Sequence, residues 1–380
     1  MKKISFAFIL LVLNNVHAET QNGFGTDFYG FIKASALHSS KALASFNNLN
    51  MSAPTHAAAQ TKSTDKKERL TFQAQQSRLG VNLKKGKQLS AKLEFDFIDF
   101  AKSSPTTQMN PRVRIASVTY VWDNSKVIIG QDWDLFSPVT SFTFDYVGLY
   151  FMAGNTGFMR QQIQYLNTQG NWEFGAAVGM AGNNPGSIEN DLELANSPSY
   201  SGRISYALEK GRLGASAIYS KLKYAENDSS HDSYAYNLFF EKSLSQTTLK
   251  SEAYYGQNLA NIGALSLGKG TMNNNVKEFG ATLTLSHKLT SKHQPFGGLG
   301  WAKVDNKNSI TPFSTNANNT ITNPGVKSNF LARVGWEYKV TEDFSWVSEI
   351  SRFETKSKIS NSSYQNNIAM SVESGIQLRF

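Results

Sequence analysis

Charged side chains recur at alternate positions of segments that otherwise have the pattern of β-strands. Near Arg78, for example, Leu79 and Val81 share one face, so Arg78 lies on the opposite face. An arginine carries a planar fork of hydrogen-bond donors that suits carboxylates, so charges gathered around a common interior would bind or steer anions. The pattern predicts that the following side chains face such an interior: Arg78, Lys92, Glu94, Asp96, Arg112, Arg114, Asp134, Asp145, Arg160, Arg203 and Arg333.

The sequence contains no residue set with the spacing of a catalytic centre. It has no cysteine, which excludes disulfides and thiolate chemistry. The histidines that follow the amino-terminal segment are His38, His56, His231, His287 and His293. They show neither metal-ligand spacing nor a partner set for a nucleophile. We therefore expect no enzymatic activity.

Two further motifs also lack the context that a ligand site needs. The run Gly263 to Gly270 imitates a phosphate-binding loop, but Gly270 stands where Ser or Thr would hold magnesium, so we expect an external loop. The acids Glu189, Asp191 and Glu193 could approach a divalent cation, but their spacing lacks the pattern of known calcium loops. No cofactor or metal is predicted.

The amino-terminal residues predict export. Lys2 and Lys3, the apolar run Ile4 to Leu13 and the small residue Ala18 fit a secretory signal peptide at residues 1–18, with 19–380 as the mature chain. The apolar run is too short to span a bilayer as a helix, and no later run is longer. Without the two lysines, the 38 basic residues fall to 36 against 29 acidic ones, a net charge of +7. That mild excess predicts no nucleic-acid partner.

The last segment, Ile368 to Phe380, alternates apolar and polar or small residues over its whole length. A strand that crosses a bilayer at a tilt needs about 9 to 11 residues, which this segment provides. Its terminal aromatic residue resembles the terminal signature of bacterial outer-membrane barrels. The resemblance implies that the barrel assembly machinery recognises this strand and that it pairs with the first strand. The alternative is an edge strand that ends on Phe by chance.

The same alternation predicts sixteen strands. They are Asp27 to Leu37, Leu70 to Lys84, Lys87 to Ile98, Arg112 to Trp122, Lys126 to Trp133, Phe158 to Thr168, Asn171 to Ala181, Ser199 to Leu208, Arg212 to Lys223, Ser233 to Leu244, Thr247 to Gln257, Val276 to Leu289, His293 to Val304, Ser328 to Val340, Asp343 to Thr355 and Asn366 to Phe380. Strand four is ambiguous. Arg112 and Arg114 share parity with Tyr120 and Trp122, so either the rings face inward or a bulge shifts the register.

Short turns and long polar loops alternate between these strands. This parity is typical of a transmembrane β-barrel with short periplasmic turns, long external loops and membrane lipid around its wall. Aromatic residues beside the short turns predict an interfacial girdle: Trp172, Trp336, Tyr338, Phe344, Trp346 and Phe380. We therefore predict an all-β, 16-stranded antiparallel barrel in the outer membrane of a Gram-negative cell. A soluble sandwich or barrel of short strands is the alternative.

Two loops differ from the others in composition. His38 to Arg69 is rich in Ala, Ser, Asn, Gln and Lys, so we expect a long, mobile first external loop, with a short helix as the alternative. Asp134 to Gly157 is apolar and carries several aromatic residues, which would be costly to leave in water. We expect this third long loop to fold into the barrel and narrow its lumen.

Four segments in the first third of the chain resemble, in order, segments of the DcaP-like porins. They are Gln76 to Val81, Lys92 to Phe97, Arg112 to Arg114 and Ile128 to Trp133. The likeness is good over about Leu70 to Phe136 and elsewhere extends only to the strand and loop pattern. It implies a trimeric channel for small anionic or dicarboxylate solutes. Only Glu19 to Thr26 precedes the first strand, so we expect a homotrimer held by barrel walls, without an amino-terminal coiled coil.

The inward charges are distributed unevenly between the two halves of the chain. The first eight strands present Arg78, Lys92, Arg112, Arg114, Arg160 and Arg203 against Glu94, Asp96 and Glu173, and the last eight present Lys250, Arg333 and Arg379 against Glu241, Glu252, Glu337, Glu349 and Glu373. We expect an electric field across the lumen. In it, four arginines of the first eight strands, which we call the first wall, would face Asp134 and Asp145 of the third loop: Arg78, Arg112, Arg114 and Arg160. The alternative is that these charges only line a solvated lumen.

The sequence therefore favours a passive diffusion channel for small hydrophilic solutes, with a mild preference for anions or carboxylates. Two other classes remain open. A structural or adhesive barrel would have a plugged lumen, and a barrel enzyme would need a clustered acid, base or nucleophile at one rim. Conductance in a planar bilayer separates the channel from both.

Overall fold

The structure is a computed structural model that describes residues 23–45, 49, 51–100, 110–181, 197–223, 230–268, 274–306, 310–315, 321–323 and 325–380. The predicted signal peptide, residues 1–18, and the acids Glu189, Asp191 and Glu193 lie outside these ranges. Within them, no helix is long and apolar enough to cross a membrane.

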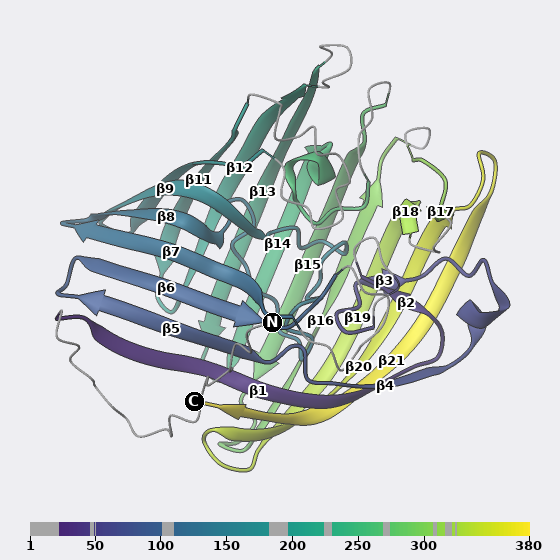
Figure 1. Cartoon of the computed structure of the whole chain (residues 1–380), viewed down its shortest axis with the longest axis horizontal. Coiled ribbons are helices and arrows are strands. Elements are labelled where there is room, and N and C mark those ends of the chain that lie inside the picture. The colour runs from purple at the N-terminus through teal and green to yellow at the C-terminus, as the bar shows by residue number, and fades with distance from the viewer. Residues whose placement is uncertain are drawn as a thin grey trace, which may run out of the picture.

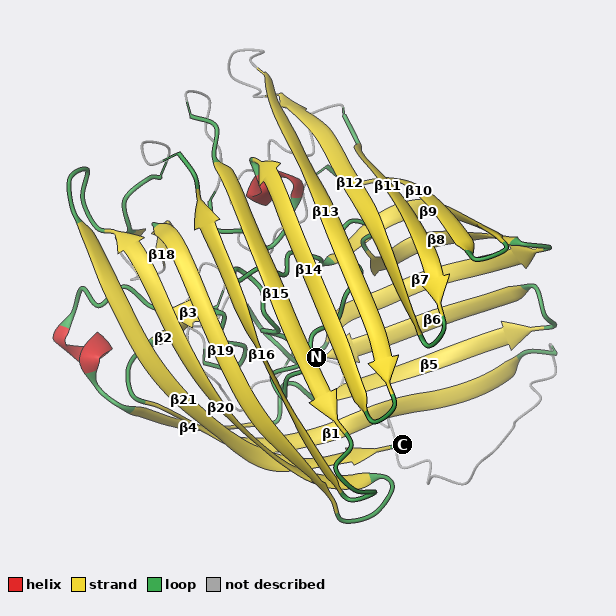
Figure 2. Ribbon diagram, turned by 180° about the vertical axis from the view of Figure 1, so that it is seen from behind, coloured by secondary structure: helices red, strands yellow, loops and turns green. Residues whose placement is uncertain are grey.

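The described residues form one closed antiparallel barrel of sixteen strands, which confirms the predicted fold class (Figures 1 and 2). The strands are β1 (Gly25–Ser39), β4 (Arg69–Gln73) with β5 (Arg78–Lys85), β6 (Leu89–Asp96), β7 (Arg112–Trp122), β8 (Ser125–Trp133), β9 (Met159–Gln169), β10 (Trp172–Gly179), β11 (Ser199–Leu208), β12 (Gly211–Lys223), β13 (Ser230–Leu244), β14 (Thr247–Gln257), β15 (Lys277–His287), β16 (His293–Val304), β19 (Val326–Lys339), β20 (Phe344–Lys358) and β21 (Tyr364–Arg379). β1 pairs with β21 on one side and with both β4 and β5 on the other, so the ring closes.

The outer wall is apolar because alternate residues of each strand point away from the lumen. In β21, Ile376 and Leu378 are exposed, whereas Glu373 and Gln377 are buried inside. Aromatic residues beside the short turns are exposed on the same outer face: Trp172, Trp336, Tyr338, Trp346 and Phe380. This surface has the apolar band and aromatic girdle of a transmembrane barrel.

A β-bulge resolves the register of β7. Glu94 of β6 pairs with Ile115, but the next residue, Phe95, pairs with Val113, which leaves Arg114 as the extra residue. Arg114 and Ile115 are consequently both buried, and the alternation inverts after them. The bulge therefore allows the arginines of β7 to face inward while Tyr120, 47% exposed, faces outward.

The second strand is interrupted, unlike the continuous strand predicted from Leu70 to Lys84. A turn at residues 74–77 separates β4 from β5, with the amide of Ser77 bonded to the carbonyl of Ala74 at 3.0 Å. The turn directs Gln76 into the lumen, where its amide donates to Asp145 and to the carbonyl of Ser52. The interruption thus provides polar partners for the two loops that lie inside the barrel.

Loop 3, the segment 134–158 between β8 and β9, folds into the barrel as predicted. Phe136 packs with Ile218 of β12 and Tyr254 of β14. Tyr150 packs with Leu331 of β19 and Phe353 of β20. The aromatic side chains that would have been costly in water are therefore buried against the inner wall.

Much of loop 1, the segment between β1 and β4, also packs inside: its residues 42–45 and 51–59 are buried, which differs from the expectation of a mobile external loop, whereas residues 61–64 and 66–68 are exposed. Its short strands β2 (Leu43–Ala44) and β3 (His56–Ala57) pair with each other, and Leu43 and Ala57 join the cluster around Tyr150. Several of its alanines are at most 5% exposed: Ala42, Ala44, Ala53, Ala57, Ala58 and Ala59. Small side chains allow the loop backbone to approach the wall closely. Among its described residues the helical part is one 3₁₀ turn, Ser63–Lys66, rather than the alternative helix.

The segment between β14 and β15 shows a third inward fold. A 3₁₀ turn at Leu259–Ile262 is buried, and Leu265 packs with Phe151 and Met159 beside loop 3. Residues 263–268, expected in an external loop, therefore cover loop 3 instead. Leucines within the glycine-rich run explain this position, because they would be costly to expose.

Gly154 allows the tip of loop 3 to approach β15, and this contact can be tested. Its φ is +100°, and a Cβ there would lie 2.2 Å from the carbonyl oxygen of Ala281. Gly154→Ala is therefore expected to lift the tip from the wall and to raise single-channel conductance and current noise. Gly86→Ala is the matched control, because Gly86 has φ +61° but no atom within 4 Å of its Cβ position. Equal conductance for the two variants would contradict this docking.

Candidate functional site

Two glutamates of the barrel wall hold the backbone and hydroxyl groups of loop 3. Glu252 of β14 accepts hydrogen bonds from the hydroxyl of Ser137 at 2.7 Å and from the amide of Val139 at 3.0 Å. Glu349 of β20 accepts from the hydroxyl of Thr143 at 2.7 Å and from an adjacent loop amide at 2.8 Å. Both carboxylates are buried. The wall acids therefore act as acceptors for the loop instead of lining open water.

Arg333 of β19 is the basic counterpart of these acids. Its guanidinium lies 3.2 Å from Asp145 and 3.6 Å from Glu349, and it donates to the hydroxyl of Thr143 and to the carbonyl of Pro54 in loop 1. Burial raises the pKa of the Asp145 carboxyl, and the charge of Arg333 opposes that shift. Arg333 thus joins both inward loops to one wall.

Lys33 of β1 is an interior charge that was missed in the sequence. Its ammonium lies 2.9 Å from Glu373 and donates to Gln76 and to the carbonyl of Phe144 in loop 3. It is buried, and it sits 3.8 Å from the centre of the Phe144 ring. Parity could have found it, because Lys33 alternates with the outward-facing Ile32 and Ala34.

Among the described residues, Arg160 is the arginine of the first eight strands that pairs with an acid of loop 3, as expected. Its Nε lies 2.9 Å from Asp134, and its other nitrogens donate to the carbonyls of Met180 and Ile262. The side chain is 3% exposed. Arg160 therefore anchors the start of loop 3, and little of it remains accessible to a solute.

The other expected pairings differ, because acids on the neighbouring strand are closer. Arg112 bonds Asp96 through two nitrogens, and Arg114 bonds Glu94 at 2.9 Å and Asp96 at 3.2 Å. Arg78 lies 3.6 Å from Glu94, and Lys92 lies 3.9 Å from the same carboxylate. Loop acids Asp134 and Asp145 are occupied by other arginines. The cluster on β5, β6 and β7 is consequently a network within one wall.

Arg203 and Arg212 extend the basic surface to β11 and β12. Arg203 lies 2.9 Å from Glu173, and Arg212 lies 2.6 Å from Glu241. Arg212 was not among the predicted site residues, although it immediately precedes the outward-facing Leu213 and must therefore face inward. With 32% of its side chain exposed, Arg212 is more accessible than Arg160.

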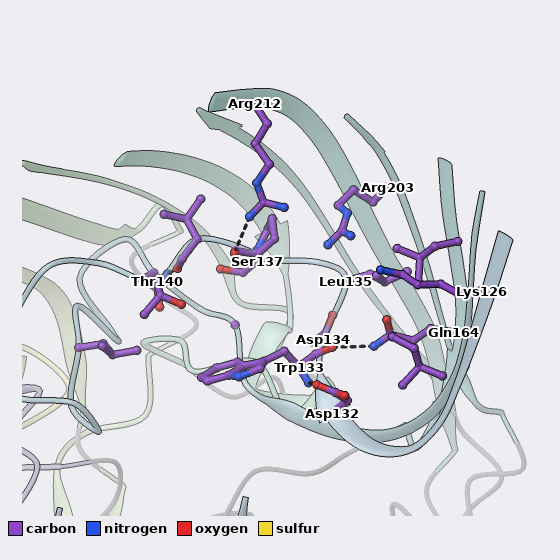
Figure 3. A pocket seen from close by; sticks show the side chains of 17 residues that line it. Lys126, Asp132, Trp133, Asp134, Leu135, Ser137, Thr140, Gln164, Arg203 and Arg212 are labelled. Carbon is purple, nitrogen blue, oxygen red and sulfur yellow. Dashed lines mark hydrogen bonds between the residues drawn. The ribbon is translucent and has the colours of Figure 1, made fainter. Parts of the chain in front are cut away.

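Described residues of loop 3 and of the wall toward the short turns line two cavities. The first, of about 220 Å³, is lined by basic residues of three strands, Lys126, Arg203 and Arg212, and by the acids Asp132 and Asp134. Figure 3 shows the three basic side chains pointing into this hollow, with the two aspartates at its other edge. The second, of about 270 Å³, is lined by Arg78, Arg114, Lys250 and Arg379 and by the acid Glu337.

In the first cavity the basic side chains face two aspartates, whereas in the second cavity basic side chains stand on more than one wall. The second cavity reaches from Arg78 of β5 and Arg114 of β7 to Lys250 of β14. The strand between the two arginines, β6, stands eight strands from β14 in the sixteen-strand ring, so these cations lie on opposite walls. The wall acids Glu252 and Glu349, expected to form the negative side of a transverse field, lie under loop 3. The described lining residues consequently carry seven basic groups against three acidic ones.

The wall and its lumen match one known architecture. A closed sixteen-strand wall with an apolar exterior, a charged interior and an inward third loop is the architecture of the outer-membrane porins. No protein-family model matches the chain, and no curated protein matches it.

Solved structures with this fold are similar to the chain over nearly its whole length. The outer membrane channel DcaP of Acinetobacter baumannii shares 13% identity with a TM-score of 0.71, over 95% of this chain and 99% of that one. OmpT of Vibrio cholerae shares 11% with a TM-score of 0.57, over 95% and 99%. The anion-selective porin from Comamonas acidovorans shares 12% with a TM-score of 0.56, over 94% and 100%. At these identities the likeness establishes the porin fold.

Removing Arg333 tests whether the buried charges hold the loops. Arg333→Ala leaves Asp145 and Glu349 buried without their cation, so we expect a loss of about 3 to 5 kcal/mol in the free energy of unfolding. Arg352→Ala is the matched control, because Arg352 and Glu354 form an exposed pair worth about 0 to 1 kcal/mol. The measurement is denaturant unfolding of the barrel in detergent. Equal losses for both variants would show that the buried network carries no stability.

His56 predicts a pH dependence of loop 1. Burial lowers the pKa of this imidazole from 6.5 to about 4. Between these pH values the released loop binds a proton that the docked loop excludes, so docking weakens as pH falls through the window, by at most about 3 kcal/mol. Well above pH 6.5, where the imidazole is neutral in both the docked and the released loop, His56 contributes no pH dependence.

Hydrogen exchange of the amides near His56 at pH 7 and pH 5, corrected for the intrinsic exchange rate, measures this change. His56→Gln is expected to remove the weakening, since Gln does not titrate. A pH response that persists unchanged in this variant would place its origin elsewhere.

Proposed function

We propose that this protein is a porin of the outer membrane that allows small hydrophilic solutes to diffuse passively, with a mild preference for anions and carboxylates. The porin-type fold supports passage through a membrane. The two cavities beside loop 3 support a route for small solutes, and no chemical step on the solute is proposed.

The observation that carries the anion preference is the charge of the cavity walls. Seven basic side chains and three acidic ones line the two cavities. Arg78, Arg203 and Arg379 offer guanidinium groups, whose donor geometry matches a carboxylate. A solute in the second cavity has cations on opposite sides, which lowers the energy of an anion and raises that of a cation. The same fold is found in a protein named as an anion-selective porin.

The assembly that we propose is a homotrimer in the outer-membrane lipid, exported by the signal peptide at residues 1–18 and inserted by the barrel assembly machinery. One solved structure of similar fold is described as a trimer form. The exposed apolar side chains of the barrel wall would supply contacts with lipid and with neighbouring subunits.

Reversal potential in a potassium chloride gradient tests the proposal. We expect stable conductance steps and a permeability ratio of chloride to potassium of about two to four, from the excess of fixed positive charge at the cavities. The double variant Arg78→Ala with Arg379→Ala is expected to move the ratio toward one. A folded barrel that stays silent would favour a structural or adhesive role, and a conducting barrel that prefers potassium would contradict the anion preference.

A further inference from the structure

Arg212, Glu241 and Lys250 form one row across three neighbouring strands. Glu241 of β13 is directly opposite Arg212 of β12 and directly opposite Lys250 of β14 in the strand register. Its carboxylate lies 2.6 Å from the Nε of Arg212 and 3.8 Å from the ammonium of Lys250. One carboxylate therefore serves two cations, whereas Arg203 has Glu173 as its own counter-ion.

The same two cations contact the first half of loop 3. Arg212 donates to the carbonyl of Pro138 at 3.1 Å, and Lys250 donates to the carbonyl of Thr140 at 2.9 Å. Lys250 also sits 4.5 Å from the centre of the Phe142 ring. Each cation is thus fixed between Glu241 and a loop carbonyl, so its position does not depend on a bound solute.

The row lies where the two cavities meet. Arg212 lines the first cavity and Lys250 lines the second, while Thr140 lines both. The side chains of Arg212, Glu241 and Lys250 are 32%, 19% and 22% exposed, so all three are partly accessible to solvent. Because one negative charge cannot neutralise two positive ones, the junction keeps a net charge of about +1.

We propose that Glu241 is the residue that sets how strongly the channel prefers anions. It positions Arg212 and Lys250 as two neighbouring binding sites for an anion. It also reduces their combined positive charge, so that an anion binds at the junction weakly enough to be released. Conduction requires binding that is weak enough for release, and two uncompensated cations would hold an anion too strongly. This inference rests on the proposed porin function and assigns the strength of its selectivity to one side chain.

Reversal potentials of the full mature chain in planar bilayers test the assignment, with Glu241→Gln as the main variant. Removing the shared negative charge is expected to raise the chloride-to-potassium permeability ratio several-fold, because the change removes an attraction for potassium and a repulsion for chloride at the same place. Sulfate, used as a dianion probe, is expected to block chloride current at a lower concentration in this variant, because the junction then holds anions longer.

Matched variants separate charge from structure. Glu241→Asp keeps the charge and is expected to retain most of the original ratio. Glu354→Gln makes the same charge change on the outward face and is expected to leave the ratio unchanged. Single variants Arg212→Gln and Lys250→Gln are expected to lower the ratio, and they keep the test open if Glu241→Gln fails to fold.

The outcomes distinguish this inference from the porin proposal. A silent or potassium-preferring parent chain would overturn the proposed function itself. A parent chain that prefers chloride, combined with a ratio and sulfate block unchanged by Glu241→Gln, would overturn only the role of Glu241. A ratio unaffected by both Arg212→Gln and Lys250→Gln would do the same.

Discussion

A charged side chain that is removed from water needs a partner of opposite charge or a set of hydrogen bonds, and the interior of this barrel is arranged around that constraint. Glu252 and Glu349 of the wall are buried, and loop 3 supplies their donors. Arg333 is buried, and its acceptors come from both inward loops and from the wall. If the loops left the lumen, these charges would lose their hydrogen-bond and ion-pair partners, which favours the inward position. The loops in turn lower the free-energy cost of burying the charges.

This arrangement decides which charges a solute can meet. Glu252 and Glu349 of the second half of the chain act as acceptors for loop 3, whereas seven arginines and lysines line the two cavities. The uneven distribution of charge in the sequence thus gives cavity walls with more basic than acidic side chains. In the selectivity that we propose, acids such as Glu241 and Glu337 partly offset those cations.

Local sequence patterns were sufficient to predict the strands of the wall and the inward fold of loop 3, because alternation and apolar content are properties of short segments. They were insufficient for loop 1, whose partners are remote in sequence: Ala57 bonds Thr355, and the amide of Gln60 bonds Gln365. Alanine-rich composition carries no signal for such contacts. The bulge at Arg114 was visible only as a conflict of parity. Arg78 and Arg112 pair with Glu94 and Asp96 of the neighbouring strand because Asp134 and Asp145 of loop 3 lie against Arg160 and Arg333.

Hydrogen exchange of the folded barrel tests most directly whether wall charges hold the loops inside the lumen. The amides of residues 137–156 in loop 3 and 51–59 in loop 1 are expected to exchange as slowly as those of the neighbouring strands β19 and β20, because they are buried and hydrogen-bonded. Exchange of either loop at the rate of a free, solvated segment, with the strands still protected, would contradict the account.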